Sequence, residues 1–135
     1  MIARTSFENL QVYKLGEKLA DEVWRIVTGW EQFPKSTVGR QIVRAADSVG
    51  ANISEGVGRG SFQDNRRFVR MARGSLNETK HWLRRAFRRG LLGTEDVKRI
   101  KPIIDEIAPK LKAYLRSIGS VREKIPVDEE SATDN

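Results

Sequence analysis

Basic side chains are concentrated in one segment of the chain. Residues 59–90 contain ten Lys and Arg residues but only two acidic ones, while the rest of the chain is close to neutral. The basic residues are Arg59, Arg66, Arg67, Arg70, Arg73, Lys80, Arg84, Arg85, Arg88 and Arg89. Arginine presents a planar fork of N–H donors that matches phosphate oxygens. The chemistry that this segment indicates is therefore the binding of phosphate or of another extended anion.

These residues have helical spacing. If the segment is a helix, several polar side chains fall within about 80° of one another and extend for about 33 Å from Arg66 to Arg88. They are Arg66, Arg70, Arg73, Asn77, His81, Arg84 and Arg88. We call the basic residues expected to bind nucleic acid the arginine face: Arg66, Arg70, Arg73, Lys80, Arg84, Arg85, Arg88 and Arg89.

Like charges four residues apart on a helix repel each other, as in the pairs Arg66/Arg70 and Arg84/Arg88. A partner of opposite charge would offset this cost. An RNA or DNA backbone fits, and its binding would depend on salt and little on base sequence. Two alternatives remain: acidic surfaces on neighbouring subunits or on a partner protein, and a face that is simply solvated.

A second group of polar residues lies along one flank of the preceding helical pattern. This polar seam consists of Gln41, Ser48, Asn52, Glu55 and Arg59. Polar groups beside a core need hydrogen bonds, so we interpret the seam as a structural network that holds helix register. Glu55 could alternatively serve as a general base, but no catalytic arrangement of Ser, Cys and His and no second carboxylate stands near it in the pattern. We expect no catalytic residues and a non-enzymatic protein.

The glycines of Gly56-x-Gly58-x-Gly60 resemble a nucleotide-binding loop, which requires a strand before the loop. A helix precedes them here, so they predict a helix stop. A weaker alternative is a single phosphate held by Arg59 and the N–H groups at the start of the next helix.

His81, the only histidine, has just Glu78 near it as a second potential metal ligand. No metal and no cofactor is therefore expected.

Apolar residues at spacings of three and four predict four amphipathic helices. They cover about residues 7–31, from Ser36 or Thr37 to Gly56, from Ser61 to Gly90, and from Thr94 to about 118. The expected N-caps of the last three are Ser36 or Thr37, Ser61, and Thr94. Short connections favour an all-α, up-down-up-down antiparallel four-helix bundle over residues 1–119. Pro102 and Pro109 are expected to kink or break the last helix. Residues 120–135 are acidic and read as a flexible tail.

The bulk composition limits the class of protein. The 135 residues suit one domain, and the net charge of +7 agrees with an anionic partner. The absence of cysteine, of a signal peptide and of any long apolar run predicts a cytoplasmic protein that does not contact membranes.

Tyr13 and Trp24 lie off the apolar stripe of the first helix, which predicts an aromatic flank for self-association.

The central residues resemble a known family. The stretch Gln41-Ile42-x-Arg44-Ala45-Ala46-x-Ser48-Val49-x-Ala51-Asn52-Ile53-Ser54-Glu55-Gly56-x-Gly58-Arg59 looks like the signature of four-helix-bundle proteins encoded in 23S rRNA intervening sequences. Further matches are Phe7-x-x-Leu10-x-Val12-Tyr13, Phe33-Pro34 and Arg67-Phe68-x-x-Met71-Ala72-x-Gly74-Ser75-x-x-Glu78. The resemblance runs from about residue 7 to 118.

The resemblance implies a single up-down bundle that assembles into a homopentameric ring. The family is similar in fold to the accessory variability determinant of diversity-generating retroelements, a basic pentamer that works with a reverse transcriptase and its template RNA. Residues 80–89 are more basic than expected of an ordinary family member, which favours the retroelement group, whereas the central signature favours the intervening-sequence group. We therefore expect an oligomer that binds RNA, or a nucleic-acid enzyme such as a reverse transcriptase.

Overall fold

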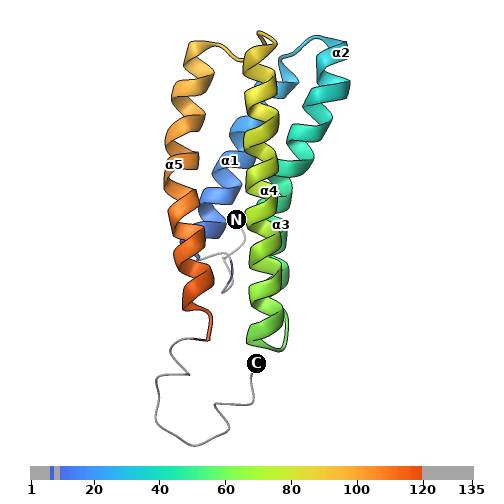
Figure 1. Ribbon diagram of the computed structural model, residues 1–135. Coiled ribbons are helices and arrows are strands. Elements are labelled where there is room, and N and C mark those ends of the chain that lie inside the picture. The colour runs from blue at the N-terminus through green and yellow to red at the C-terminus, as the bar shows by residue number, and fades with distance from the viewer. Residues whose placement is uncertain (1–6, 8–9, 120–135) are drawn as a thin grey trace, which may run out of the picture.

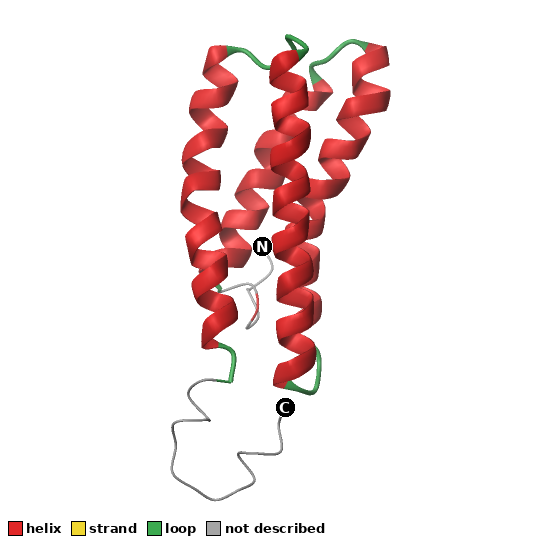
Figure 2. Ribbon diagram, in the orientation of Figure 1, coloured by secondary structure: helices red, strands yellow, loops and turns green. Residues whose placement is uncertain are grey.

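The computed structural model describes residues 7 and 10–119, and this part of the chain is helical and contains no strand (Figures 1 and 2). The long helices are α1 (Gln11–Thr28), α3 (Arg40–Val57), α4 (Phe62–Arg88) and α5 (Thr94–Ser117). A short α2 (Gln32–Pro34) and a π-helical turn η2 (Lys35–Gly39) lead directly into α3. The expected all-α four-helix bundle is confirmed. The predicted tail over residues 120–135 lies outside the described residues.

Each long helix is followed by one that runs back beside it (Figure 1). Helix α1 packs against α3 and α5, and α4 packs far more extensively against α3 than against α5. The core lies between the four long helices, where the apolar stripes meet. Its fully buried side chains include Leu19 from α1, Ile42 and Ile53 from α3, Val69 from α4 and Ile107 from α5.

The start of the second predicted helix is wrong. Ser36 and Thr37 are not caps, because the chain is already helical from Gln32. Their hydroxyl groups donate to the carbonyl oxygen of Phe33, at 3.2 and 2.7 Å, instead of accepting from backbone N–H groups. Pro34 lies in the first turn, where its missing N–H is not needed by the helix. Pro34 therefore belongs to the start of this helix.

The ends of α4 agree with expectation. The Ser61 side chain accepts a hydrogen bond from the Asp64 N–H at 3.1 Å, which makes Ser61 the predicted cap. At the other end Gly90 has a φ of +76°, a left-handed conformation that glycine adopts without strain.

The expected cap of α5 and the expected break at its prolines are wrong, while a kink there stays a prediction. The cap is Gly93, whose N–H donates to the Asp96 carboxylate at 3.0 Å, and Thr94 is already helical. Pro102 and Pro109 do not break the helix, which continues from Thr94 to Ser117. Both prolines are exposed, while the opposite face of α5 is buried in the core. Burial of that apolar face stabilises the helix enough to outweigh the lost backbone hydrogen bonds.

The backbones of α3 and α4 approach closely near Gly56. A Cβ atom at Gly56 would lie 2.5 Å from Asn65 Oδ1, 3.1 Å from Phe68 Cβ and 3.2 Å from the Asn65 carbonyl oxygen. Two of these atoms belong to the α4 backbone or its first side-chain carbon, so they cannot rotate away. The absence of a side chain at Gly56 thus sets how near the start of α4 lies to the end of α3.

Gly56→Ala should lower the free energy of unfolding by about 1–2 kcal/mol, because the added methyl group forces α3 and α4 apart. Gly74→Ala is the matched control, since a Cβ atom at this exposed helical position meets nothing within 4 Å. It should raise the free energy of unfolding by about 0.4–1 kcal/mol. Urea unfolding followed by circular dichroism measures both. Equal effects of the two substitutions would contradict the close approach at Gly56.

Candidate nucleic-acid interface

Most of the arginine face lies on the outer surface of α4. The side chains of Ala72, Leu76 and Leu83 are buried, and this fixes which side of the helix faces solvent. Six members of the face are exposed and Arg85 is half-buried. The exposed ones are Arg70, Arg73, Lys80, Arg84, Arg88 and Arg89. Within residues 7 and 10–119, none of these seven side chains forms an ion pair or hydrogen bond, so their charges are not compensated within that part of the monomer.

Arg66 differs from the other members of the face. It is half-buried, and its guanidinium group donates a 2.8 Å hydrogen bond to the carbonyl oxygen of Ile118. This bond joins the first turns of α4 to the residue that follows α5. Arg66 therefore contributes to the fold, a role that helical spacing alone does not reveal.

Arg59 and Arg67, which flank the start of α4, are also engaged. Both guanidinium groups lie over the Phe68 ring, with Cζ 4.9 and 4.7 Å from the ring centroid. Arg59 pairs with Glu55 at 3.2 Å, and Arg67 with Asp64 at 3.7 Å. The single-phosphate alternative at the glycine cluster would thus require Arg59 to leave contacts that it already makes.

The polar seam lies along α3. The Ser48 hydroxyl donates to the Arg44 carbonyl oxygen at 2.8 Å, and the Asn52 amide donates to the Ser48 carbonyl oxygen at 2.9 Å. With the Glu55–Arg59 pair, these contacts run within α3 and its C-terminal end. Gln41 instead borders a cavity shared with α4. A role of the seam in helix register stays a prediction.

Two hollows flank α4. On the side of α5, an apolar groove is lined by Leu83, Phe87, Leu92, Val97, Ile100 and Ile104, with Arg84 and Lys101 at its edge. On the side of α3, a cavity of about 570 Å³ is lined by Phe33, Ser36, Thr37, Val38, Arg40, Gln41, Trp82 and Arg89. Periodicity along one helix could not identify either, because each combines residues from separate elements.

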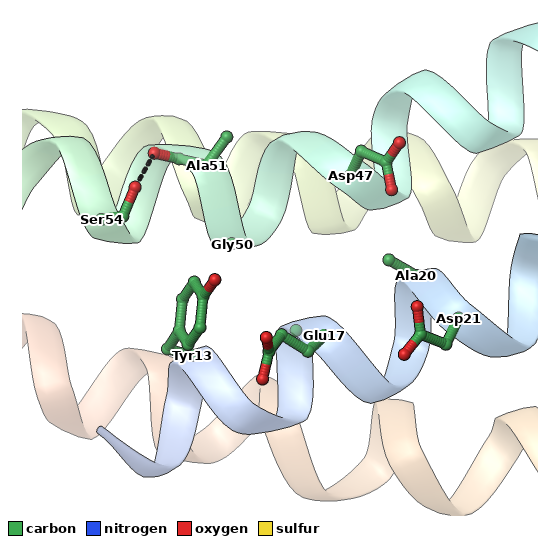
Figure 3. Close-up of a pocket in the computed structure, with 9 residues that line it drawn as sticks. Tyr13, Glu17, Ala20, Asp21, Asp47, Gly50, Ala51 and Ser54 are labelled. Carbon is green, nitrogen blue, oxygen red and sulfur yellow. Dashed lines mark hydrogen bonds between the residues drawn. The ribbon is translucent and has the colours of Figure 1, made fainter. Parts of the chain in front are cut away.

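An acidic cleft lies between α1 and α3, away from the arginine face. Glu17 and Asp21 come from α1 and Asp47 from α3, and their carboxylates border the same space (Figure 3). Partial burial raises the pKa of Asp47 above its ordinary value, and the nearby negative charge of Asp21 raises it further. The cleft is the acidic counterpart to the arginine face, and sequence reasoning missed it because its residues lie on two helices.

The predicted aromatic flank on α1 is only half present. Trp24 is 59% exposed. Tyr13 is half-buried, packs against the core and makes an edge contact with Phe7 at a ring distance of 5.1 Å.

Among the described residues, no three His, Cys, Asp or Glu side chains gather to hold a metal ion. In the same part of the chain, no helix is both long and apolar enough to cross a membrane.

The comparisons with known proteins agree with the resemblance seen in the sequence. The family model for the 23S rRNA-intervening sequence protein matches residues 8–113. A crystal structure of a protein of unknown function from the S23 ribosomal protein family of Bacteroides thetaiotaomicron is similar, with a TM-score of 0.70 at 24% identity. The match covers 78% of this chain and 99% of that one, and it supports the fold. No curated protein matches the chain.

Arg66→Met should lower the free energy of unfolding by about 1–2 kcal/mol, because the half-buried carbonyl group of Ile118 loses its charged donor. Arg70→Met removes an exposed arginine of the same helix without a described partner, and should change stability by less than about 0.5 kcal/mol. Thermal and urea unfolding measure the difference. If both variants unfold like the wild type, the Arg66–Ile118 contact does not stabilise the bundle.

Proposed function

The chain belongs to the family of 23S rRNA-intervening sequence proteins, and on this basis we propose that it is a non-enzymatic, oligomeric helical bundle that binds RNA through the arginine face. The observation that carries the proposal is the absence of any described partner for the basic side chains from Arg70 to Arg89. Their mutual repulsion on one helix would be relieved by a polyanion.

The shape of the face suits a nucleic-acid backbone. The charges follow one side of a straight helix for about 27 Å between Arg70 and Arg88. Guanidinium groups spaced along this line can each contact phosphate oxygens of an extended strand. Such contacts set affinity and position but carry little sequence information. We propose single-stranded RNA, or a template RNA held by a reverse transcriptase, as the partner.

A second candidate function is an interaction scaffold in which the arginine face pairs with acidic surfaces of neighbouring subunits. The acidic cleft of Glu17, Asp21 and Asp47 favours it, because the cleft offers the complementary charge on another side of the same chain. An oligomer built from such contacts would lose its assembly when either surface is reversed in charge. The two functions therefore make different predictions for the same variants.

RNA binding should weaken steeply with salt and depend on the arginine face. The variant Arg70→Glu, Arg73→Glu, Arg84→Glu should bind a fluorescent single-stranded RNA at least about tenfold more weakly than the wild type at low salt. The slope of log affinity against log salt should fall by about 0.7 for each lost phosphate contact, the value for a single strand. Fluorescence anisotropy over a salt series measures both quantities.

The matched control is Lys14→Glu, Lys18→Glu, Lys112→Glu, which changes net charge equally through exposed residues on α1 and α5. It should retain most of the RNA affinity. If the two triple variants lose affinity alike, total charge is responsible and the arginine face is not a site. If wild type has no RNA affinity at low salt, the proposal is wrong, and loss of assembly in the arginine variant would favour the scaffold.

We also propose the homopentameric ring that the family resemblance implies. Size-exclusion chromatography with light scattering should then give a mass of five times 15.4 kDa. Five copies of the arginine face would add their contacts to one RNA through avidity. Trp24→Ser, which removes an exposed aromatic side chain from α1, tests whether Trp24 contributes to assembly. A wild-type mass of one chain would exclude the ring.

A further inference from the structure

The cavity between α2, η2, α3 and α4 combines aromatic and basic side chains. Phe33 from α2 lines it and is 76% exposed, more than any other large hydrophobic side chain in the described part. Trp82 enters from α4. The hollow is open to solvent, and its volume of about 570 Å³ leaves room for a flat ring system. An exposed aromatic side chain beside such a space offers apolar surface that a flat ligand can cover.

The second aromatic side chain is held in place. The Trp82 indole N–H donates to the Glu78 carboxylate at 3.2 Å, and the ring makes an edge contact with His81 at 4.8 Å between ring centroids. Trp82 is partly buried and packs against the core. Its indole therefore offers a surface that needs little ordering when a ligand binds, which reduces the entropic cost of binding.

The charged residues that line the cavity are of one sign, and the Glu78 carboxylate lies behind Trp82. Arg40 from α3 and Arg89 from the end of α4 line it, and no acidic residue does. Neither guanidinium group, nor the Gln41 amide, has a hydrogen bond or ion pair within residues 7 and 10–119. Arg89 also belongs to the arginine face, so the cavity continues the basic surface of α4. A ligand that suits it has a flat aromatic part, polar edges and a negative charge.

We propose that this cavity receives one unstacked base of single-stranded RNA bound along the arginine face, with Phe33 and Trp82 contacting the base and Arg40 and Arg89 contacting its flanking phosphates. This inference rests on the proposed RNA binding and adds a base-contacting subsite to it. Stacking of a base on aromatic side chains tolerates any base, because every base has a π-face. The Gln41 amide can hydrogen-bond to the base edge, since it has both a donor and an acceptor.

The test compares two decamers of equal length and charge: decauridylate and a decamer of abasic residues. Wild type should bind decauridylate about 5- to 30-fold more tightly than the abasic decamer. Phe33→Ala should abolish most of this ratio and leave affinity for the abasic decamer unchanged. Because Phe33 is mostly exposed, the variant should keep the wild-type melting temperature, which is measured alongside.

Two further variants define the site. Phe87→Ala is the matched control, because Phe87 is 57% exposed but lines the groove on the other side of α4, and it should keep the wild-type ratio. Arg40→Gln combined with Arg89→Gln should weaken binding of both decamers alike and lower the salt slope by about 1.4, or about 0.7 for each lost contact to a single strand.

The outcomes separate this inference from the proposed function. If wild type binds both decamers equally and with a steep salt dependence, the base subsite is absent although RNA binding stands. If Phe33→Ala and Phe87→Ala both keep the ratio, the base contacts another part of the protein. If Phe33→Ala changes the mass of the oligomer, the cavity is a protein contact and the inference is wrong. If neither decamer binds at low salt, both proposals fail.

Discussion

Burial of one apolar stripe on α4 determines where every basic side chain of that helix lies. Val69, Ala72, Leu76, Leu83 and Ala86 face the core. With 3.6 residues per turn, the residues between them must face solvent or the helix flanks. The stripe is held mainly against α3, and the lack of a side chain at Gly56 lets the two backbones approach. Any change that rotates α4 would expose apolar surface and bury arginine, so packing keeps the basic surface in one orientation.

The arginines of this surface are not equivalent. Arg66 holds the end of α5 through the Ile118 carbonyl group, and Arg59 and Arg67 lie over Phe68. Between Arg70 and Arg89, the basic side chains have no partner within residues 7 and 10–119. The part available to a ligand is thus the middle and C-terminal portion of α4, and this portion ends beside the cavity that contains Arg89. At this end of the helix, the basic side chains proposed to bind the RNA backbone lie next to the aromatic side chains proposed to contact a base.

The opposite charge of the cleft between α1 and α3 gives the chain an uneven charge distribution. The carboxylates of Asp21 and Asp47 are close enough for the first to raise the pKa of the second, so each would gain from a cationic neighbour. In an oligomer this cleft offers a complementary surface to the arginine face of a neighbouring subunit, because the two carry opposite charge. A subunit contact that used the whole arginine face would leave little of it for RNA. A contact elsewhere on the chain would leave it available.

The sequence alone determined the all-α class, the four amphipathic helices, the family and the outward stripe of arginine. These features depend on local spacing, and the Ser61 cap and the left-handed Gly90 are local as well. Tertiary structure decided the rest. Packing against α1 keeps α5 continuous through Pro102 and Pro109, and the fold brings Arg66 to Ile118 and Phe33 to the cavity beside Trp82. Periodicity specifies which side of a helix is buried, but contacts between helices depend on how their side chains and backbones fit together.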